Sequence, residues 1–345
     1  MTGVIRVLII DDSAFIRKAV GEMLSHSPFI EVVGQARDGC EALDMIGKLK
    51  PDVITCDLMM PRLDGVGFVR EQMARAPVPI LILTAAPEDG DKALEAMEAG
   101  AVDIVQKPTA LANDQILQLR GELIEKVKAV AHAHAGKLQP MVAPPPVLER
   151  LVRREVRTKI VVIGISTGGP QALRYLLPQF PADFPVPIAM VLHMPLGYTE
   201  MFAQKLNEIS RLKVTQAREG DEILPGAAFL APAGSHLLLR PGPRHRVTAQ
   251  LSSTPLNTLH RPAIDQLFRS AAECYGDGVL GVVMTGMGND GKEGSAWIKA
   301  RGGTILTEAE QSCIIYGMPR SVVEAGLSDA AVPLDQMAQT IMKNL

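Results

Sequence analysis

Short apolar runs alternate with amphipathic stretches along the first third of the chain. The runs are rich in β-branched residues, as strands buried on both faces of a parallel sheet are. They span residues 5–10, 30–33, 53–55, 80–83 and 102–105. Residues 14–24, 41–49 and 92–99 carry apolar side chains at helical spacing between these runs. Strands and helices that alternate in this way predict a doubly wound parallel sheet.

A proline-rich segment separates this region from the rest of the chain. Helical patterning continues to about residue 135 and fails at residues 139–146, which end in three consecutive prolines. Because proline cannot occupy a helix interior, this segment is expected to be an extended, semi-rigid linker. We therefore expect a first domain at residues 1–125, a helical tail and linker at residues 126–157, and a second domain at residues 158–345.

The second domain shows the same alternation of patterns. Strands are expected at residues 159–163, 188–192, 228–230, 279–284 and 303–306. Residues 236–251 have the pattern of a hairpin, which predicts an antiparallel edge on this sheet. The chain is therefore expected to be an α/β protein with two doubly wound domains.

Composition narrows the classes of function. The 345 residues are too many for one typical domain, and the net charge of -3 gives no electrostatic case for binding nucleic acid. No apolar run reaches the ~18 residues needed to span a bilayer, so direct membrane insertion is not expected. The four cysteines form no C-x-x-C pair. Since the N-terminus also lacks a signal pattern, a cytoplasmic protein is expected.

Polar residues stand where four strands of the first domain end. Asp11 and Asp12 follow the first strand, Asp57 the third, Thr84 the fourth and Lys107 the fifth. The carboxyl ends of parallel strands share one edge, so these side chains should converge. The three carboxylates would repel one another unless a hard cation such as Mg²⁺ joined them. One carboxylate could then accept a phosphoryl group, with Thr84 and Lys107 holding its oxygens.

An Asp-Asp pair alone could be explained by helix caps and solvated loop residues, but five residues at matching strand ends make that explanation poor. Residues 4–125 resemble a response-regulator receiver domain, through residues 57–65 and the Lys107-Pro108 pair. The resemblance implies a flavodoxin-like parallel sheet and phosphorylation of Asp57 by a partner histidine kinase. It also implies two-component signalling. One departure is Ile104, where the family usually has Tyr or Phe.

A serine in the second domain lies on a tight turn. Residues 164–168 read Gly-Ile-Ser-Thr-Gly, between an expected strand and a helix expected at residues 171–177. Such a turn exposes the hydroxyl of Ser166 as a nucleophile, and backbone N–H groups ahead of the helix can stabilise an oxyanion. Serine is also a good helix cap. This segment alone leaves both interpretations open.

A serine nucleophile needs a base and an orienting acid. His193 follows the expected strand at residues 188–192, on the serine's edge of the sheet, and His236 is the best rival. Asp290 lies in the loop after the strand at residues 279–284. The chain order Ser, His, Asp differs from the Ser, Asp/Glu, His order of α/β-hydrolases, so a different hydrolase fold is expected.

Two other classes of function are alternatives to a serine hydrolase. Residues 286–292 fit a glycine-rich nucleotide-binding pattern, with Glu308 ending the next strand. However, Asp290 within that loop would oppose a pyrophosphate, and Glu293 stands where a phosphate site needs a hydroxyl. A phosphorylation-controlled binding module without catalysis is the other alternative. All three candidate catalytic residues are present, so no feature of the sequence supports this alternative.

Residues 159–345 resemble the catalytic domain of the chemotaxis protein-glutamate methylesterases. The matching segments are residues 164–170, 193–195, 285–291 and 316–320. The resemblance implies a hydrolase with the triad Ser166, His193 and Asp290, and oxyanion support near Thr167 and Met287. Ile165 and Ala263 stand where the family often has Ala and Ser.

The same resemblance implies a substrate and a mode of control. The substrates would be methyl-accepting chemoreceptors, whose glutamate methyl esters are hydrolysed and whose glutamines are deamidated during chemotaxis adaptation. The esterase reaction would need no cofactor. The receiver would repress the enzyme until it is phosphorylated, which makes the chain a phosphoprotein with two linked sites.

Overall fold

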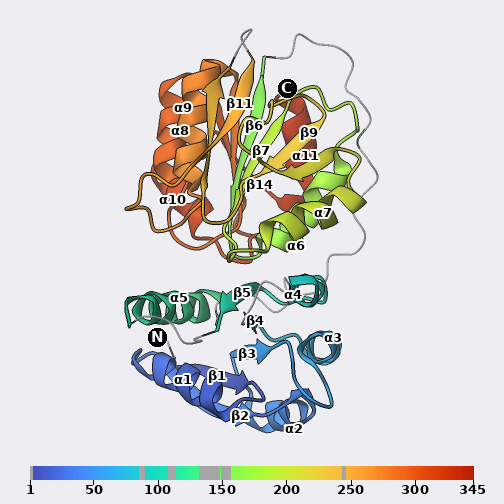
Figure 1. Ribbon diagram of the computed structural model, residues 1–345, viewed down its shortest axis with the longest axis vertical. Helices are drawn as coiled ribbons and strands as arrows, with labels where there is room; N and C mark the ends of the chain where they lie inside the picture. Colours follow the sequence, from blue (N-terminus) through green and yellow to red (C-terminus); the bar gives the residue numbers. More distant parts are fainter. Residues whose placement is uncertain (1–2, 85–89, 108–112, 132–147, 149–156, 243–245) are drawn as a thin grey trace. The chain divides into compact units, whose positions relative to one another are not determined.

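The computed structural model describes residues 3–84, 90–107, 113–131, 148, 157–242 and 246–345. The chain divides into two compact units, Met1–Pro140 and Met141–Leu345. Each unit has its own parallel sheet (Figure 1). The expected proline-rich linker at residues 139–146 lies outside the described residues.

The first unit is a five-stranded parallel sheet in the order β2-β1-β3-β4-β5. Its strands are β1 (Ile5–Ile10), β2 (Ile30–Ala36), β3 (Val53–Asp57), β4 (Ile80–Thr84) and β5 (Asp103–Gln106). Its helices are α1 (Ala14–Ser25), α2 (Gly39–Leu49), α3 (Gly65–Arg75), α4 (Gly90–Glu98) and α5 (Asn113–Ala131). This strand order is that of flavodoxin-like folds. The expected doubly wound first domain is confirmed.

The apolar runs form strands because they are covered by helices on both faces. Every residue of β3 and β4 is buried, and helix α1 packs with α5 while α3 packs with α2 and α4. The register pairs Ile10 with Cys56 and Asp57 with Leu83. The residues that follow β1, β3 and β4 therefore share one edge of the sheet.

The second unit contains a seven-stranded parallel sheet in the order β14-β13-β12-β6-β7-β9-β8. Its strands are β6 (Ile160–Ile165), β7 (Ile188–Leu192), β8 (Lys213–Gln216), β9 (Ala227–Leu230), β12 (Val279–Val283), β13 (Thr304–Glu308) and β14 (Ala330–Val332). The expected hairpin, β10 (His236–Pro241) and β11 (Val247–Ser252), is present, but it forms a separate two-stranded antiparallel sheet and not the antiparallel edge expected on the larger sheet.

Helices cover both faces of this larger sheet. They are α6 (Gly169–Leu176), α7 (Thr199–Ile209), α8 (Ile264–Tyr275), α9 (Lys292–Ala300), α10 (Met318–Glu324) and α11 (Leu334–Lys343), with 3-10 turns at η3 (Leu177–Gln179) and η5 (Gly276–Gly278). Figure 1 shows α8, α9 and α10 on one side of the sheet, and α6, α7 and α11 on the other. Phe268 and Ile298, from α8 and α9, are fully buried in the core beneath them. The α/β class expected for the second domain is confirmed.

The apolar pattern of the sequence does not predict the two edge strands β8 and β14. Lys213–Gln216 has a single fully buried residue, and only Val332 is buried in Ala330–Val332. An edge strand is covered less completely than a central one, so its sequence lacks the continuous apolar run that marks the inner strands.

In the described part of the chain, no helix has both the length and the apolar character needed to cross a membrane.

Candidate functional site

Three neighbouring strands of the second sheet position the predicted triad. Ser166 follows β6, His193 follows β7, and Asp290 lies in the loop between β12 and α9. Strand β6 lies between β12 and β7 in the sheet, and Ile165 is the register partner of Leu192. Because the strands are parallel, the residues that follow them meet at the carboxyl edge.

The three side chains form a continuous hydrogen-bonded chain. Ser166 Oγ lies 3.2 Å from His193 Nδ1, and His193 Nε2 lies 2.9 Å from Asp290 Oδ2. The side chains of His193 and Asp290 are 9% and 13% exposed. With Nε2–H donating to the carboxylate, Nδ1 presents its lone pair to the serine hydroxyl. The arrangement can move the hydroxyl proton to the imidazole.

The turn that carries Ser166 is shaped by glycine. Gly168, the N-cap of α6, has a φ of 79°, in the left-handed region that favours glycine. The N–H of Gly169 donates to the Ser166 carbonyl oxygen at 2.7 Å, and the Ser166 N–H donates to Thr285 O at 3.0 Å. No side chain caps α6, and the hydroxyl of Ser166 lies against His193.

Asp290 is held in its charged form. Burial opposes its ionisation, but the hydrogen bond and charge of His193 and the N–H groups of Ile264 and Asp265 outweigh burial and lower its pKa to about 2. Those two N–H groups donate to the carboxylate at 2.8 and 2.9 Å. Asp290 therefore remains a carboxylate near neutral pH and can stabilise a protonated imidazole.

A second carboxyl group, which the sequence analysis did not single out, lies next to Asp290. Burial raises the pKa of Asp265; the N–H groups of Gly294 and Gly291 oppose that rise, and the charges of Asp290 and Glu293 add to it, bringing the value to about 7. Asp265 belongs to the first turn of α8, where an acidic residue is usually explained by the helix dipole alone. No pattern in the sequence therefore sets Asp265 apart.

The other histidines near the site have different surroundings. His236, the rival base, is fully buried; its Nδ1 accepts the Ala263 N–H at 3.1 Å, and its Nε2 lies 3.2 Å from Pro255 O. Burial lowers the pKa of His236, which keeps the ring neutral. His260 instead stacks on the ring of His193, with 4.0 Å between ring centroids and 23° between planes. No pattern in the sequence predicts this contact.

The predicted oxyanion residues border the serine. Thr167 directly follows Ser166, and the carbonyl oxygen of Thr167 accepts the Thr285 hydroxyl at 3.0 Å. A Cβ built on Gly286 would lie 2.8 Å from Ser166 Cβ, so the backbone just before Met287 passes close to the serine. Met287 also lines a cavity of about 180 Å³ together with His260 and Asp290.

The groups that a nucleotide site would need are used within the protein. The carboxylate of Glu308 is fully buried, and it accepts the Thr285 N–H and the Ser312 hydroxyl, each at 2.9 Å. Asp290 inside the glycine-rich loop is bonded to His193 and to the start of α8. This geometry argues against the nucleotide-binding alternative.

The polar strand ends of the first unit also converge. Lys107 Nζ lies 2.7 Å from Asp57 Oδ1 and 2.9 Å from Asp11 Oδ2. Burial raises the pKa of Asp57, and Lys107 opposes this rise. Burial also acts to lower the pKa of Lys107, but the carboxylates of Asp57 and Asp11 outweigh burial, so the pKa of Lys107 is raised. The Lys107 N–H donates to Thr84 O at 2.7 Å, which brings Thr84 to the same edge.

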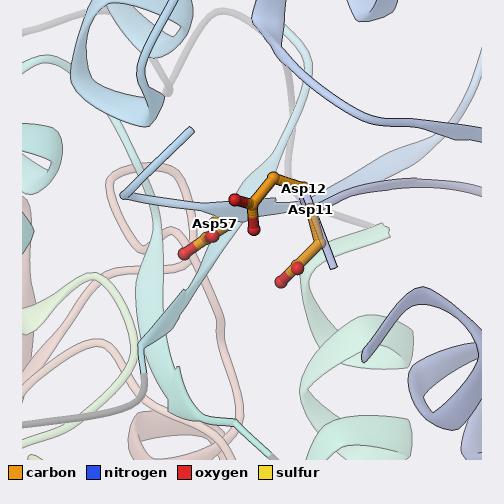
Figure 2. Close-up of side chains that lie close together, drawn as sticks. All are labelled: Asp11, Asp12 and Asp57. Atoms are coloured by element: carbon orange, nitrogen blue, oxygen red, sulfur yellow. The ribbon is translucent and has the colours of Figure 1, made fainter. Parts of the chain in front are cut away.

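The acidic cluster has the donor chemistry of a hard-cation site. One carboxylate oxygen from each of Asp11, Asp12 and Asp57 lies within 4.8 Å of the others (Figure 2). Asp11 and Asp57 are buried and Asp12 is exposed, so the cluster is open on one side. Three carboxylate oxygens with room for water suit Mg²⁺. The residues present therefore fit the expected metal.

Each of the two units matches a known protein family. Residues 161–341 match the family described as CheB methylesterase, and residues 7–118 match the response regulator receiver domain. The chain is 47% identical to protein-glutamate methylesterase/protein-glutamine glutaminase 5 of Myxococcus xanthus, over 99% of this chain and 98% of the relative. It is 38% identical to protein-glutamate methylesterase/protein-glutamine glutaminase 1 of Oleidesulfovibrio alaskensis, over 98% of both.

A solved structure matches the second unit. The crystal structure of the Thermotoga maritima CheB methylesterase catalytic domain aligns with a TM-score of 0.53 and 38% identity. The alignment covers 55% of this chain and 99% of that domain. The catalytic fold is therefore similar along the whole length of that domain.

Proposed function

The chain belongs to the CheB methylesterase family and carries a response regulator receiver domain, and we propose that Ser166, His193 and Asp290 are its catalytic triad. The substrates we propose are glutamate methyl esters and glutamines on methyl-accepting chemoreceptors. Both are acyl compounds, so one serine site can hydrolyse either. The names of the relatives, which combine methylesterase and glutaminase activities, support this assignment.

The proposed reaction passes through an acyl-enzyme. His193 Nδ1 takes the proton as Ser166 Oγ bonds to the carbonyl carbon, and Asp290 stabilises the imidazolium. The bond from that carbon to the methoxy oxygen, or to the amide nitrogen, then breaks, and the imidazolium returns the proton to the leaving group. Methanol or ammonia departs. Water repeats the sequence on the acyl-enzyme, which frees a glutamate carboxyl group and restores Ser166.

Backbone N–H groups would stabilise the negative oxygen of the tetrahedral intermediates. We assign this role to the N–H groups of Thr167 and Met287. The support is their place: Thr167 begins the turn into α6, and Met287 follows Gly286, which lies against Ser166. Donors placed in advance at such a position typically contribute ~10²–10³-fold to rate.

The receiver would control this reaction. In our proposal the Asp57 carboxylate accepts a phosphoryl group from a histidine kinase, and Thr84 and Lys107 contact its oxygens. Asp11, Asp12 and Asp57 would hold Mg²⁺, which when bound neutralises charge at the site. The close approach of Lys107 to Asp57 supports this assignment. The cytoplasm remains the expected location of the transfer.

The observation that carries the proposed function is the Ser166–His193–Asp290 chain of contacts at 3.2 and 2.9 Å. The test measures methanol release from methylated chemoreceptor, with and without a small acyl-phosphate donor. Ser166→Ala should lower the rate by several orders of magnitude, because the triad acts as a unit. Ser210→Ala, at the C-cap of α7, is the matched control and should keep the wild-type rate. Near-normal turnover by Ser166→Ala would rule out the serine mechanism.

A further inference from the structure

The N-termini of helices α8 and α9 lack polar caps of their own. The N-cap residues are Ala263 for α8 and Gly291 for α9, and neither has a side chain that can accept a hydrogen bond. The first N–H groups of a helix have no partner within it and usually bond to such a side chain. Their partners must come from another part of the chain.

The cap of α8 is the predicted triad acid. Asp290 Oδ2 accepts the Ile264 N–H at 2.8 Å, and Asp290 Oδ1 accepts the Asp265 N–H at 2.9 Å. His236 Nδ1 accepts the preceding N–H, that of Ala263. The carboxylate that bonds His193 therefore also caps the N-terminus of α8.

The cap of α9 comes in return from α8. Asp265 Oδ1 accepts the Gly291 N–H at 3.0 Å and the Gly294 N–H at 2.6 Å. Gly291 is the residue directly after Asp290. Asp290, in the loop just before α9, thus caps α8, and Asp265, in the first turn of α8, caps α9.

Glycine lets the two helices approach closely enough for this exchange. A Cβ on Gly294 would lie 2.5 Å from Phe268 Cβ and 3.0 Å from Asp265 Cα, so a larger side chain would push α9 away from α8. Gly291 has a φ of 95°, which an L side chain rarely adopts. The close contact between the N-termini of α8 and α9 therefore depends on glycine at both positions.

We propose that Asp265 is a positioning residue for the catalytic acid. By holding the N–H groups of Gly291 and Gly294, it fixes the end of the loop that carries Asp290. It thereby fixes the distance between Asp290 and His193. The inference rests on the proposed function, since Asp265 acts only through Asp290. A displacement of about 1 Å in a catalytic group can cost ~10²-fold in rate.

Two substitutions separate the hydrogen bonds of Asp265 from its charge. Asp265→Ala removes the acceptor of both N–H groups and should lower kcat for methanol release by roughly 10–100-fold, with little change in KM. Asp265→Asn retains an oxygen at the Oδ1 position and can keep both bonds, so it should restore most of the wild-type kcat. Asp335→Ala, which removes an exposed first-turn acid from α11, should match the wild-type protein.

A double-mutant cycle tests whether Asp265 acts through Asp290. Asp290→Ala alone should lower kcat strongly, and adding Asp265→Ala should lower it little further, because the loop then has no acid to position. If the two losses multiply, Asp265 acts independently and the inference is wrong. If Asp290→Ala itself has no effect, the proposed triad fails, and that failure is recognised separately from the failure of the positioning role.

The comparison requires folded variants. Each is checked in the full-length chain by circular dichroism and by its melting curve. If Asp265→Ala does not melt cooperatively, Asp265→Glu replaces it, since that change keeps the charge but moves the carboxylate by one methylene. Wild-type kcat in a folded Ala or Glu variant, or a loss in Asp265→Asn as large as in Asp265→Ala, would overturn the proposal.

Discussion

The hydroxyl of Thr285 donates a hydrogen bond to the carbonyl oxygen of Thr167 at 3.0 Å, which ties the loop after β12 to the serine turn after β6. Thr285 is 1% exposed, and its carbonyl oxygen accepts the N–H of Ser166. Its own N–H donates to the buried carboxylate of Glu308. Thr285 therefore joins the proposed nucleophile to the strand β13.

Thr285→Val should impair both stability and activity. Valine has nearly the same shape but no hydroxyl, so the Thr167 carbonyl oxygen and the Ile315 N–H, which bonds Thr285 Oγ1 at 3.0 Å, would each lose a buried partner. Each loss costs about 1–3 kcal/mol of the free energy of unfolding. Thr285→Ser keeps the hydroxyl and serves as control. Urea unfolding and methanol release measure the two effects; a valine variant equal to wild type in both would contradict this role.

Acyl phosphate and Mg²⁺ should label the protein at Asp57. Asp57→Asn should abolish labelling, because the amide is a poor nucleophile and cannot form the acyl phosphate. Asp91→Asn, at the exposed start of α4, should leave labelling unchanged. Chelation of Mg²⁺ should also prevent labelling. Labelling that survives the change at Asp57, or that ignores the chelator, would place the acceptor elsewhere.

Compared with the wild-type protein, the Asp265→Asn variant should become more stable as pH rises. The pKa of Asp265 is raised in the folded state to about 7, above its ordinary value of 3.8, so the stability gained by keeping the proton is present below pH 4 and is lost as pH rises through about 7. Asparagine does not titrate and avoids that loss, of roughly 2–4 kcal/mol. Melting curves of both proteins from pH 4.5 to 8.5 measure it. A constant difference across this range would contradict the assigned shift.

The sequence predicts the strand ends better than it predicts the links between helices. Ser166 and His193 each directly follow an apolar run, and neighbouring parallel strands bring such residues together, so their proximity could be expected from pattern alone. Asp265 could not be found in this way. Its position becomes meaningful only when α8 and α9 pack side by side with their N-termini adjacent, a contact that depends on Gly294 and on no local pattern. The catalytic roles themselves stay predictions until the variants are measured.

Ile104 bears on how strongly phosphorylation should act. The residue lies in β5 and is 1% exposed, at the position where the receiver family usually has an aromatic residue. The resemblance implies that an aromatic ring there reorients when the domain is phosphorylated, and isoleucine has no ring that could make this change. We therefore expect a smaller activation factor than in relatives with Tyr or Phe, measured as the ratio of methanol release with and without phosphodonor. A ratio equal to theirs would show that the aromatic residue is dispensable.

Deleting residues 1–150 should raise basal methylesterase activity and make it indifferent to phosphodonor. The second unit has its own sheet and core, so it should fold without the receiver. If the receiver represses the enzyme, phosphorylation shifts a population from a repressed to an active state, and removing the receiver has the same effect permanently. Full-length Asp57→Asn is the control and should stay at the unphosphorylated rate. If the truncated protein is no faster than that control, repression is wrong, and the receiver instead serves to recruit the enzyme to its receptor complex.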